Sequence, residues 1–480
     1  MKKLISFVLA IVLTFSLCVP AFAAEEATVK YDGDPIVVVR GIDFAGLVNA
    51  DGSSALSLGA FEVLDLIFDI GGYQITGQKA AGAHAIADFG KNVFANLMVN
   101  QDGTPVKSDV HIPKFYDCGA DLDLSGDKWA DTAVGLFRSL TKKYGGENVY
   151  LYTFDWRLSP SVLADDLNSF FEMVKSKTGA SKLDVAACSM GGMVTTAYID
   201  KYGANIFDSL VFFSPALNGV DLVGSAFTGD LTISGQDLTQ FLIKKVGGNF
   251  FVDILLKILD FLGLIDIVSN FVNEILRDYG DIIYDEFLCE VFRTTYGLWG
   301  MVPDEYYDDA VELFFGGVED EYAVALQKIA EIKSFVTRTE KILATIPSTV
   351  KVSFVSHYNN KQLPIYSKAY LHGDGVIESR RTSNGATFAN YGATLSDADL
   401  AGVAAEYISP DRVVNASTIT MFKDSTWIVK GAKHVGCKDN SDHTEFAIWL
   451  LAQDTQPTVH TNAAYPRFLN CDANENFIAF

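Results

Sequence analysis

The chain contains 480 residues, of which 49% are hydrophobic and 20% are charged, so it holds enough apolar material for a large globular core. Its formal net charge of −23 excludes the proteins that bind nucleic acid through clustered Lys and Arg. These values favour one large domain with an insertion.

The N-terminus has the pattern of a secretory signal peptide. Two lysines follow the first Met, an apolar run covers residues 4–19, and small residues end the segment at Ala23. We therefore predict a signal peptide over residues 1–23 and a secreted, extracellular protein. A lipoprotein anchor at Cys18 is the alternative interpretation. The remaining cysteines are too few for a disulfide scaffold, although Cys437 and Cys471 could form one bridge.

The predicted elements then alternate along the chain. Short apolar runs predict buried strands at residues 35–41, 148–154, 182–187 and 209–213, and amphipathic patterns predict helices at 131–144, 161–177 and 193–202. Strands that alternate with helices indicate a mainly parallel sheet covered on both faces.

This alternation stops after the fourth predicted strand. Residues 219–346 read mostly as amphipathic helices, and charged side chains interrupt their most apolar part, so we expect no transmembrane span there. Strands return at 350–355 and 425–430, and a last helix fits 445–452. The predicted organisation is a core in two parts, residues 24–218 and 347–480, around a helical lid or cap insertion at 219–346.

Ser189 lies where a predicted strand turns directly into a helix, in Ala187-Cys188-Ser189-Met190-Gly191. A nucleophile elbow needs such a turn, with small residues two positions before and after the Ser. Gly191 meets that need, and Ala187 adds one methyl group. Two alternatives stay open: a glycine-rich turn without chemistry, and Cys188 as the nucleophile, although its position normally faces away from the site.

A Ser nucleophile requires a base and an acid, in the chain order Ser, acid, His. His434 follows the strand at 425–430 and is the favoured base; His443, which looks like a surface residue, is the alternative base, and His460 lies in a tail. Asp374 lies between two glycines after the strand at 350–355 and is the favoured acid, with Glu378 as runner-up.

The oxyanion of an acyl-transfer intermediate needs two donors. One should be the backbone amide of Met190, directly after the nucleophile. The other should come from the loop after the first strand, most simply the amide of Ile42. This chemistry requires neither a metal nor an organic cofactor. Residues 121–127 resemble half of a calcium-binding loop, but Thr132 stands where the loop needs Glu, so an acidic turn is expected.

Four segments together resemble the lecithin:cholesterol acyltransferase and lysosomal phospholipase A2 family of α/β hydrolases. They are Phe154-Asp-Trp-Arg157, Ser189-Met-Gly-Gly192, His372-Gly-Asp-Gly-Val376 and Tyr296-Gly-Leu-Trp-Gly-Met-Val-Pro303, which looks like that family's lid segment. The resemblance extends patchily over residues 35–450. It implies an α/β-hydrolase fold with a helical lid.

Carried over by position, the resemblance implies Ser189 as nucleophile, Asp374 as acid and His434 as base, with oxyanion donors at Ile42 and Met190. The sequence departs from the family pattern in three places: Arg40 before the first glycine, Ala187 in the elbow, and an insertion at 384–411.

The sequence therefore predicts a secreted serine hydrolase that cleaves lipid esters, with a lid whose apolar face makes transient contact with a lipid interface. An acyltransferase would share its acyl-enzyme. Two alternatives remain: a small-ester esterase or peptidase with the same triad, and a non-catalytic binding protein on a hydrolase fold.

Overall fold

The computed structural model describes residues 33–43, 46–56, 60–115, 118–119, 132–232, 264–362 and 365–480. The predicted signal peptide (1–23) and acidic turn (121–127) lie outside these ranges. Within the described part of the chain, no helix has the length and apolar character needed to cross a lipid bilayer.

A parallel sheet of seven strands forms the centre of the molecule, in the order β2-β1-β3-β4-β5-β8-β9. The strands are β1 (Ile36–Val39), β2 (Val149–Tyr152), β3 (Leu183–Cys188), β4 (Phe207–Phe213), β5 (Lys351–Tyr358), β8 (Thr426–Lys430) and β9 (Phe468–Asn470). The first six correspond to the predicted strands. The last was not predicted, because its three residues are too short to show a pattern.

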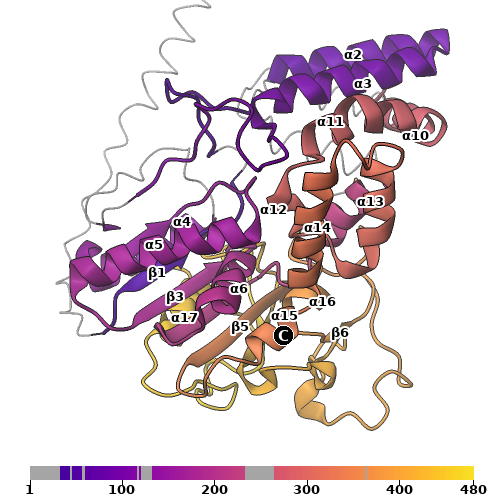
Figure 1. The fold of residues 1–480 in the computed structure, drawn as a ribbon. Helices are drawn as coiled ribbons and strands as arrows, with labels where there is room; N and C mark the ends of the chain where they lie inside the picture. Colours follow the sequence, from indigo (N-terminus) through magenta and orange to yellow (C-terminus); the bar gives the residue numbers. More distant parts are fainter. Residues whose placement is uncertain are drawn as a thin grey trace, which may run out of the picture.

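Helices cover both faces of the sheet (Figure 1). They are α4 (Thr132–Tyr144), α5 (Pro160–Thr178), α6 (Met190–Tyr202) and α17 (Asp442–Leu451). Alternation along β1 separates the two apolar cores: Val37 and Val39 pack with α5 and α6, whereas Ile36 and Val38 pack with α4 and α17. A strand apolar on both faces is what a doubly covered parallel sheet requires.

Between β4 and β5 the described chain is helical, and we call this part the cap. It contains α7 (Asp221–Phe227), α10 (Leu264–Ile283), η6 (Tyr284–Leu288), α11 (Cys289–Phe292), α12 (Tyr296–Trp299), η7 (Asp304–Tyr306), α13 (Tyr307–Phe315), α14 (Ala323–Val336) and α15 (Thr339–Leu343). Aromatic side chains fill its interior; Trp299, for example, lies against Phe227 and Phe314. These residues join the core that faces α5 and α6.

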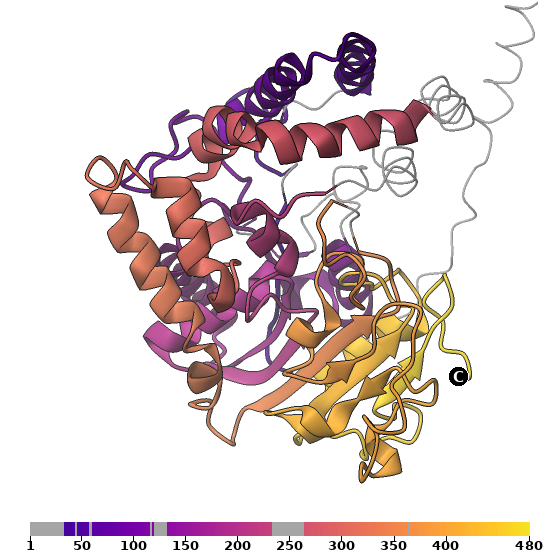
Figure 2. The same ribbon diagram turned by 90° about the vertical axis from the view of Figure 1, so that its right-hand side faces the viewer.

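Two further helices, α2 (Ala60–Thr76) and α3 (Lys79–Phe94), lie alongside α10 and away from the sheet (Figures 1 and 2). They were not among the elements predicted from the sequence. A Cβ at Gly82 would lie only 2.7 Å from Ile275, so the missing side chain lets α3 approach α10 closely. The three helices share a separate apolar cluster that includes Ile70, Phe271 and Ile275.

The chain between β5 and β8 forms α16 (Ser379–Thr382) and a small two-stranded sheet, β6 (Thr387–Phe388) and β7 (Val414–Asn415). Short 3₁₀ turns complete the described structure at Ala95–Leu97, Gly146–Asn148, Ala405–Tyr407, Ala416–Thr418 and Lys423–Ser425. The possible bridge between Cys437 and Cys471 does not form, since both thiols are free.

Candidate active site

Ser189 occupies a strained turn between β3, which ends at Cys188, and α6, which begins at Met190. Its φ of 54° and ψ of −126° are rare for a residue with a side chain, and such strain marks a nucleophile elbow. A Cβ at Gly191 would lie 2.5 Å from the carbonyl oxygens of Val39 and Arg40, so only glycine fits there.

Ala187, which adds a methyl group at the small-residue position of the elbow, is completely buried within β3. Its backbone pairs in register with Val39 of β1 and Phe212 of β4. The methyl group therefore fits inside a regular part of the sheet.

His434 connects the hydroxyl of Ser189 to the carboxylate of Asp374. Its Nε2 lies 2.8 Å from Ser189 Oγ, and its Nδ1 lies 2.7 Å from Asp374 Oδ2. Asp374 is held in turn, because its Oδ1 accepts hydrogen bonds from the amides of Val376 (2.9 Å) and Ile377 (2.8 Å). The three side chains follow β3, β5 and β8, whose carboxyl ends meet at one edge of the sheet.

The residues named as alternatives lie elsewhere. His443 is completely buried in α17, where its Nε2 lies 3.0 Å from His357 Nε2, so its expected place on the surface was wrong. Burial lowers the pKa of His443 to about 4. Glu378 accepts a hydrogen bond from the amide of Asp221 (3.0 Å), and His460 is exposed. Cys188 is buried beside the nucleophile.

The loop after β1 passes directly beside the nucleophile. A Cβ at Gly41 would lie 2.8 Å from Ser189 Cβ and 3.2 Å from its Oγ, so glycine permits this approach. Arg40 is buried and forms an ion pair with Asp43 (2.7 Å), which fixes the loop on both sides of Gly41 and Ile42. The amide of Met190 belongs to the first turn of α6, where N–H groups have no partner within the helix.

The Phe154-Asp-Trp-Arg157 segment is held by a buried ion pair. The Arg157 guanidinium binds Asp155 through two nitrogens, at 2.8 Å and 2.6 Å, and donates to the carbonyl of Val110. The guanidinium is completely buried. Trp156 is buried as well.

The cap reaches this segment through α12. A Cβ at Gly297 would lie 1.8 Å from the carbonyl oxygen of Trp156 and 2.9 Å from Cε of Met190. A Cβ at Gly300 would lie 2.7 Å from Sδ of Met193. Two glycines therefore allow the cap to contact the first turn of the nucleophile helix.

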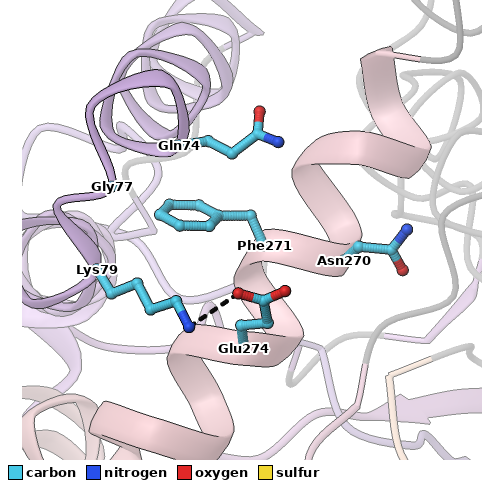
Figure 3. A pocket seen from close by; sticks show the side chains of 6 residues that line it. All are labelled: Gln74, Gly77, Lys79, Asn270, Phe271 and Glu274. Carbon is cyan, nitrogen blue, oxygen red and sulfur yellow. Dashed lines mark ion pairs between the residues drawn. The ribbon is translucent and has the colours of Figure 1, made fainter.

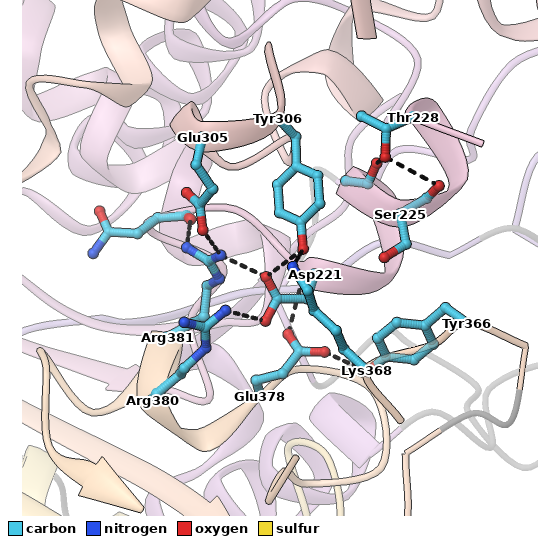
Figure 4. A network of polar contacts seen from close by, with 12 residues as sticks. Asp221, Ser225, Thr228, Glu305, Tyr306, Tyr366, Lys368, Glu378, Arg380 and Arg381 are labelled. Atoms are coloured by element: carbon cyan, nitrogen blue, oxygen red, sulfur yellow. Dashed lines mark hydrogen bonds and ion pairs between the residues drawn. The ribbon is translucent and has the colours of Figure 1, made fainter. Parts of the chain in front are cut away.

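A network of charged groups around the buried carboxylate of Asp221 joins the cap to the segment after Asp374 (Figure 4). The carboxylate of Asp221 binds Arg380 (2.6 Å) and Arg381, and Arg381 also binds Glu305 of the cap. Burial raises the pKa of Asp221, but the two guanidinium groups outweigh it and hold that pKa below its ordinary value. Sequence reasoning missed this network, because its members come from distant segments.

A cavity of about 370 Å³ lies between the α2–α3 turn and α10 (Figure 3). Lys79 borders it and pairs with Glu274 at 2.8 Å. This cavity lies among the outer helices, and none of the triad candidates lines it. Within the described ranges, no cluster of three or more His, Cys, Asp or Glu side chains could hold a metal ion.

A family model described as serine aminopeptidase, S33, matches residues 158–252, which include the elbow. None of the curated proteins matches the sequence. Fourteen chains of solved structures match. One comes from the Tle4–Tli4 complex, with a TM-score of 0.38, 11% identity, and coverage of 87% of this chain and 97% of that chain.

Another is a mutant of the N-acyl homoserine lactonase AidH complexed with N-hexanoyl homoserine, with a TM-score of 0.26 and 12% identity, covering 70% of this chain and 83% of that chain. The fold is identified by the parallel sheet, the strand-to-helix elbow at Ser189 and the matched family segment. The chain has an α/β-hydrolase fold of the serine-hydrolase type.

Proposed function

We propose that this protein is a secreted serine hydrolase that cleaves carboxylic ester bonds of lipids through Ser189, His434 and Asp374. The observation that carries the proposal is the continuous chain of hydrogen bonds from Ser189 Oγ through His434 to Asp374. A hydroxyl, an imidazole and a buried carboxylate in this order make up the machinery of acyl transfer.

On this proposal the reaction has two stages. Ser189 Oγ attacks the ester carbonyl carbon while His434 Nε2 takes the hydroxyl proton, and the amides of Ile42 and Met190 stabilise the oxyanion. The tetrahedral intermediate collapses, its C–O bond breaks, and His434 returns the proton to the leaving alcohol. Water then attacks the acyl-enzyme with the same base, releasing the acid and free Ser189. Asp374 holds the imidazole and stabilises its charged form.

The cap supports the choice of lipid esters. Its helices are rich in buried aromatic residues, and α12 reaches the first turn of α6 beside the nucleophile. The resemblance to the lecithin:cholesterol acyltransferase and lysosomal phospholipase A2 family points the same way, and so does the amphipathic character of residues 219–346. Secretion rests on the sequence pattern of residues 1–23 alone.

A peptidase or small-ester esterase is the second candidate, and the match to a serine aminopeptidase family model favours it. The same triad would serve either substrate, because both reactions pass through an acyl-enzyme. The two candidates differ in what the cap accommodates, namely an acyl chain or a polar group. A non-catalytic binding protein is the third candidate. The hydrogen-bonded arrangement of Ser189, His434 and Asp374 argues against it.

Fluorophosphonate labelling tests whether the site is reactive. The wild-type protein should react, and Ser189→Ala should not; equal labelling of both proteins would refute the proposal. A series of p-nitrophenyl esters of increasing chain length, measured with and without detergent micelles, tests the substrate class. Lipid specificity predicts kcat/KM that rises with chain length, whereas a preference for acetate esters or aminoacyl amides would favour the second candidate.

A further inference from the structure

The turn that carries His434 is strained at the next residue. Val435 has a φ of 51°, which a β-branched residue rarely adopts, and its side chain is 3% exposed. Such a conformation persists only where surrounding contacts hold it. Within the turn, Gly436 donates its amide to the carbonyl of Lys433 at 2.8 Å. This hydrogen bond joins residues only three positions apart. Contacts with other segments must therefore fix the turn relative to Ser189.

Two completely buried histidines lie behind this turn. His443 of α17 places its Nδ1 3.7 Å from the thiol of Cys437 and interacts with the backbone of Gly436. His357 of β5 interacts with the backbone of Lys433. The two imidazoles thus contact both ends of the turn that contains His434 and Val435.

The same pair reaches the nucleophile side. The Nδ1 of His357 lies 3.0 Å from the hydroxyl of Ser214. Two residues near Ser214 bind the backbone of Ser189. The carbonyl of Phe213 accepts from the Ser189 amide at 3.0 Å, and the amide of Ala216 donates to the Ser189 carbonyl at 2.9 Å. A continuous buried path therefore joins the turn beneath the nucleophile to the turn that bears the base.

Burial keeps both imidazoles of this path neutral. Two imidazoles whose Nε2 atoms lie 3.0 Å apart need one N–H and one lone pair between them. Burial, with the nearby His443 and His434, holds the pKa of His357 well below its ordinary value. Both rings thus stay uncharged while His434 gains a proton during acyl transfer, and the second charge that would repel it never forms.

We infer that His357 and His443 are positioning residues, which brace the turn Lys433–Cys437 against the Ser214 turn and so hold His434 Nε2 within reach of Ser189. This inference rests on the proposed function, since it concerns the geometry of that same site. His443 resembles a second candidate base in the sequence, but in the structure it supports the base.

The test compares His443→Leu, His357→Leu and the double variant with the wild-type protein on one soluble ester. Misplaced supporting residues cost roughly 10- to 100-fold in turnover. Each single variant should therefore lose kcat by about that factor at nearly unchanged KM. Because the two rings act as one unit, the double variant should lose no more than the worse single variant, rather than the product of both losses.

Three further variants separate positioning from simple stability. His443→Gln keeps a neutral donor and acceptor and should recover much of the lost kcat. Ser214→Ala removes only the hydroxyl that meets His357 and should lower kcat several-fold even if the Leu variants fail to fold. Phe207→Leu, at the buried start of β4, should lower the melting temperature without changing kcat of the folded enzyme.

The outcomes are distinct. A folded His443→Leu or Ser214→Ala protein with wild-type kcat would overturn the inference, and so would fully multiplicative losses in the double variant. If Ser189→Ala is labelled by fluorophosphonate as strongly as the wild-type protein, the proposed function fails instead. If labelling depends on Ser189 but not on His443 or Ser214, only the positioning role fails.

Discussion

Glu378 provides a stability test that is independent of catalysis. Its side chain is completely buried, and burial together with the neighbouring carboxylate of Asp221 raises its pKa to about 7. One of its oxygens accepts from the amide of Asp221 and the other meets the hydroxyl of Tyr366. Glu378→Gln imitates the protonated acid, because its carbonyl can accept from the amide while its NH₂ group donates to Tyr366.

The magnitude follows from linkage between protonation and folding. The folded pKa of about 7 lies above the ordinary value of 4.5, so the folded state holds this proton more tightly than the unfolded chain. The stability that Glu378 contributes is complete below pH 4.5 and is lost as pH rises through 7. At about 1.4 kcal/mol for each pKa unit, the loss is about 3 kcal/mol at pH 8.5.

Denaturant unfolding of the wild-type and Glu378→Gln proteins between pH 4.5 and pH 8.5 measures this difference. The two should have similar free energies of unfolding at pH 4.5, and the Gln variant should be more stable by about 3 kcal/mol at pH 8.5. Titration of other groups cancels in the comparison. A difference that does not change with pH would refute the reasoning.

Glu305→Gln is the matched control in the same network. Burial would raise the pKa of Glu305, but the Arg381 guanidinium beside it holds that pKa below its ordinary value. Its stabilising contribution is therefore present above pH 4.5 and is lost as pH falls through the folded pKa. This variant should therefore be less stable than the wild-type protein by a constant amount between pH 4.5 and pH 8.5, and the difference should shrink only below pH 4.5.

Three further predictions concern close backbone contacts. Gly191→Ala would place a methyl group 2.5 Å from the carbonyl oxygen of Arg40, so fluorophosphonate labelling should fall by at least tenfold, as measured by gel fluorescence. Ala187→Gly removes a methyl that fits; it should cost about 0.5–1 kcal/mol in denaturant unfolding and leave kcat within about twofold. Gly297→Ala would bring a methyl against the carbonyl of Trp156, so the melting temperature and long-chain esterase activity should both fall, detectable by thermal scanning and ester assays.

The sheet was predictable because its strands are buried on both faces. Ile36–Val39 is apolar throughout, and Asp184 is the one charged residue in the buried strand Leu183–Cys188. Helical patterns of ordinary length separate such runs. The positions of Ser189, Asp374 and His434 could be proposed because each follows a recognisable strand. Parallel strands bring their carboxyl ends to one edge, so positions far apart in sequence become neighbours in space.

Features without a local signal were missed. Helix α3 is rich in Ala and Gly and shows a weak apolar stripe, because its packing on α10 depends on close approach at Gly82 rather than on large side chains. The Ser-Asp-His443 segment reads as polar, yet His443 is buried, because its imidazole finds His357 and Cys437 as partners. Partners contributed by distant segments leave no pattern in either segment alone.

The two most distinctive sequence motifs, one around Trp156 and the other around Gly297, meet in a single packing contact. The carbonyl of Trp156 occupies the place of a Cβ at Gly297, and the amide of Gly297 donates to the carbonyl of Arg157 at 3.2 Å. Arg157 is itself fixed by Asp155. Each motif is therefore constrained by the other, and together they set the distance between the cap and the first turn of α6. A change in either should alter how the cap sits over Ser189, and hence which substrates reach it, before it affects the chemistry of the triad.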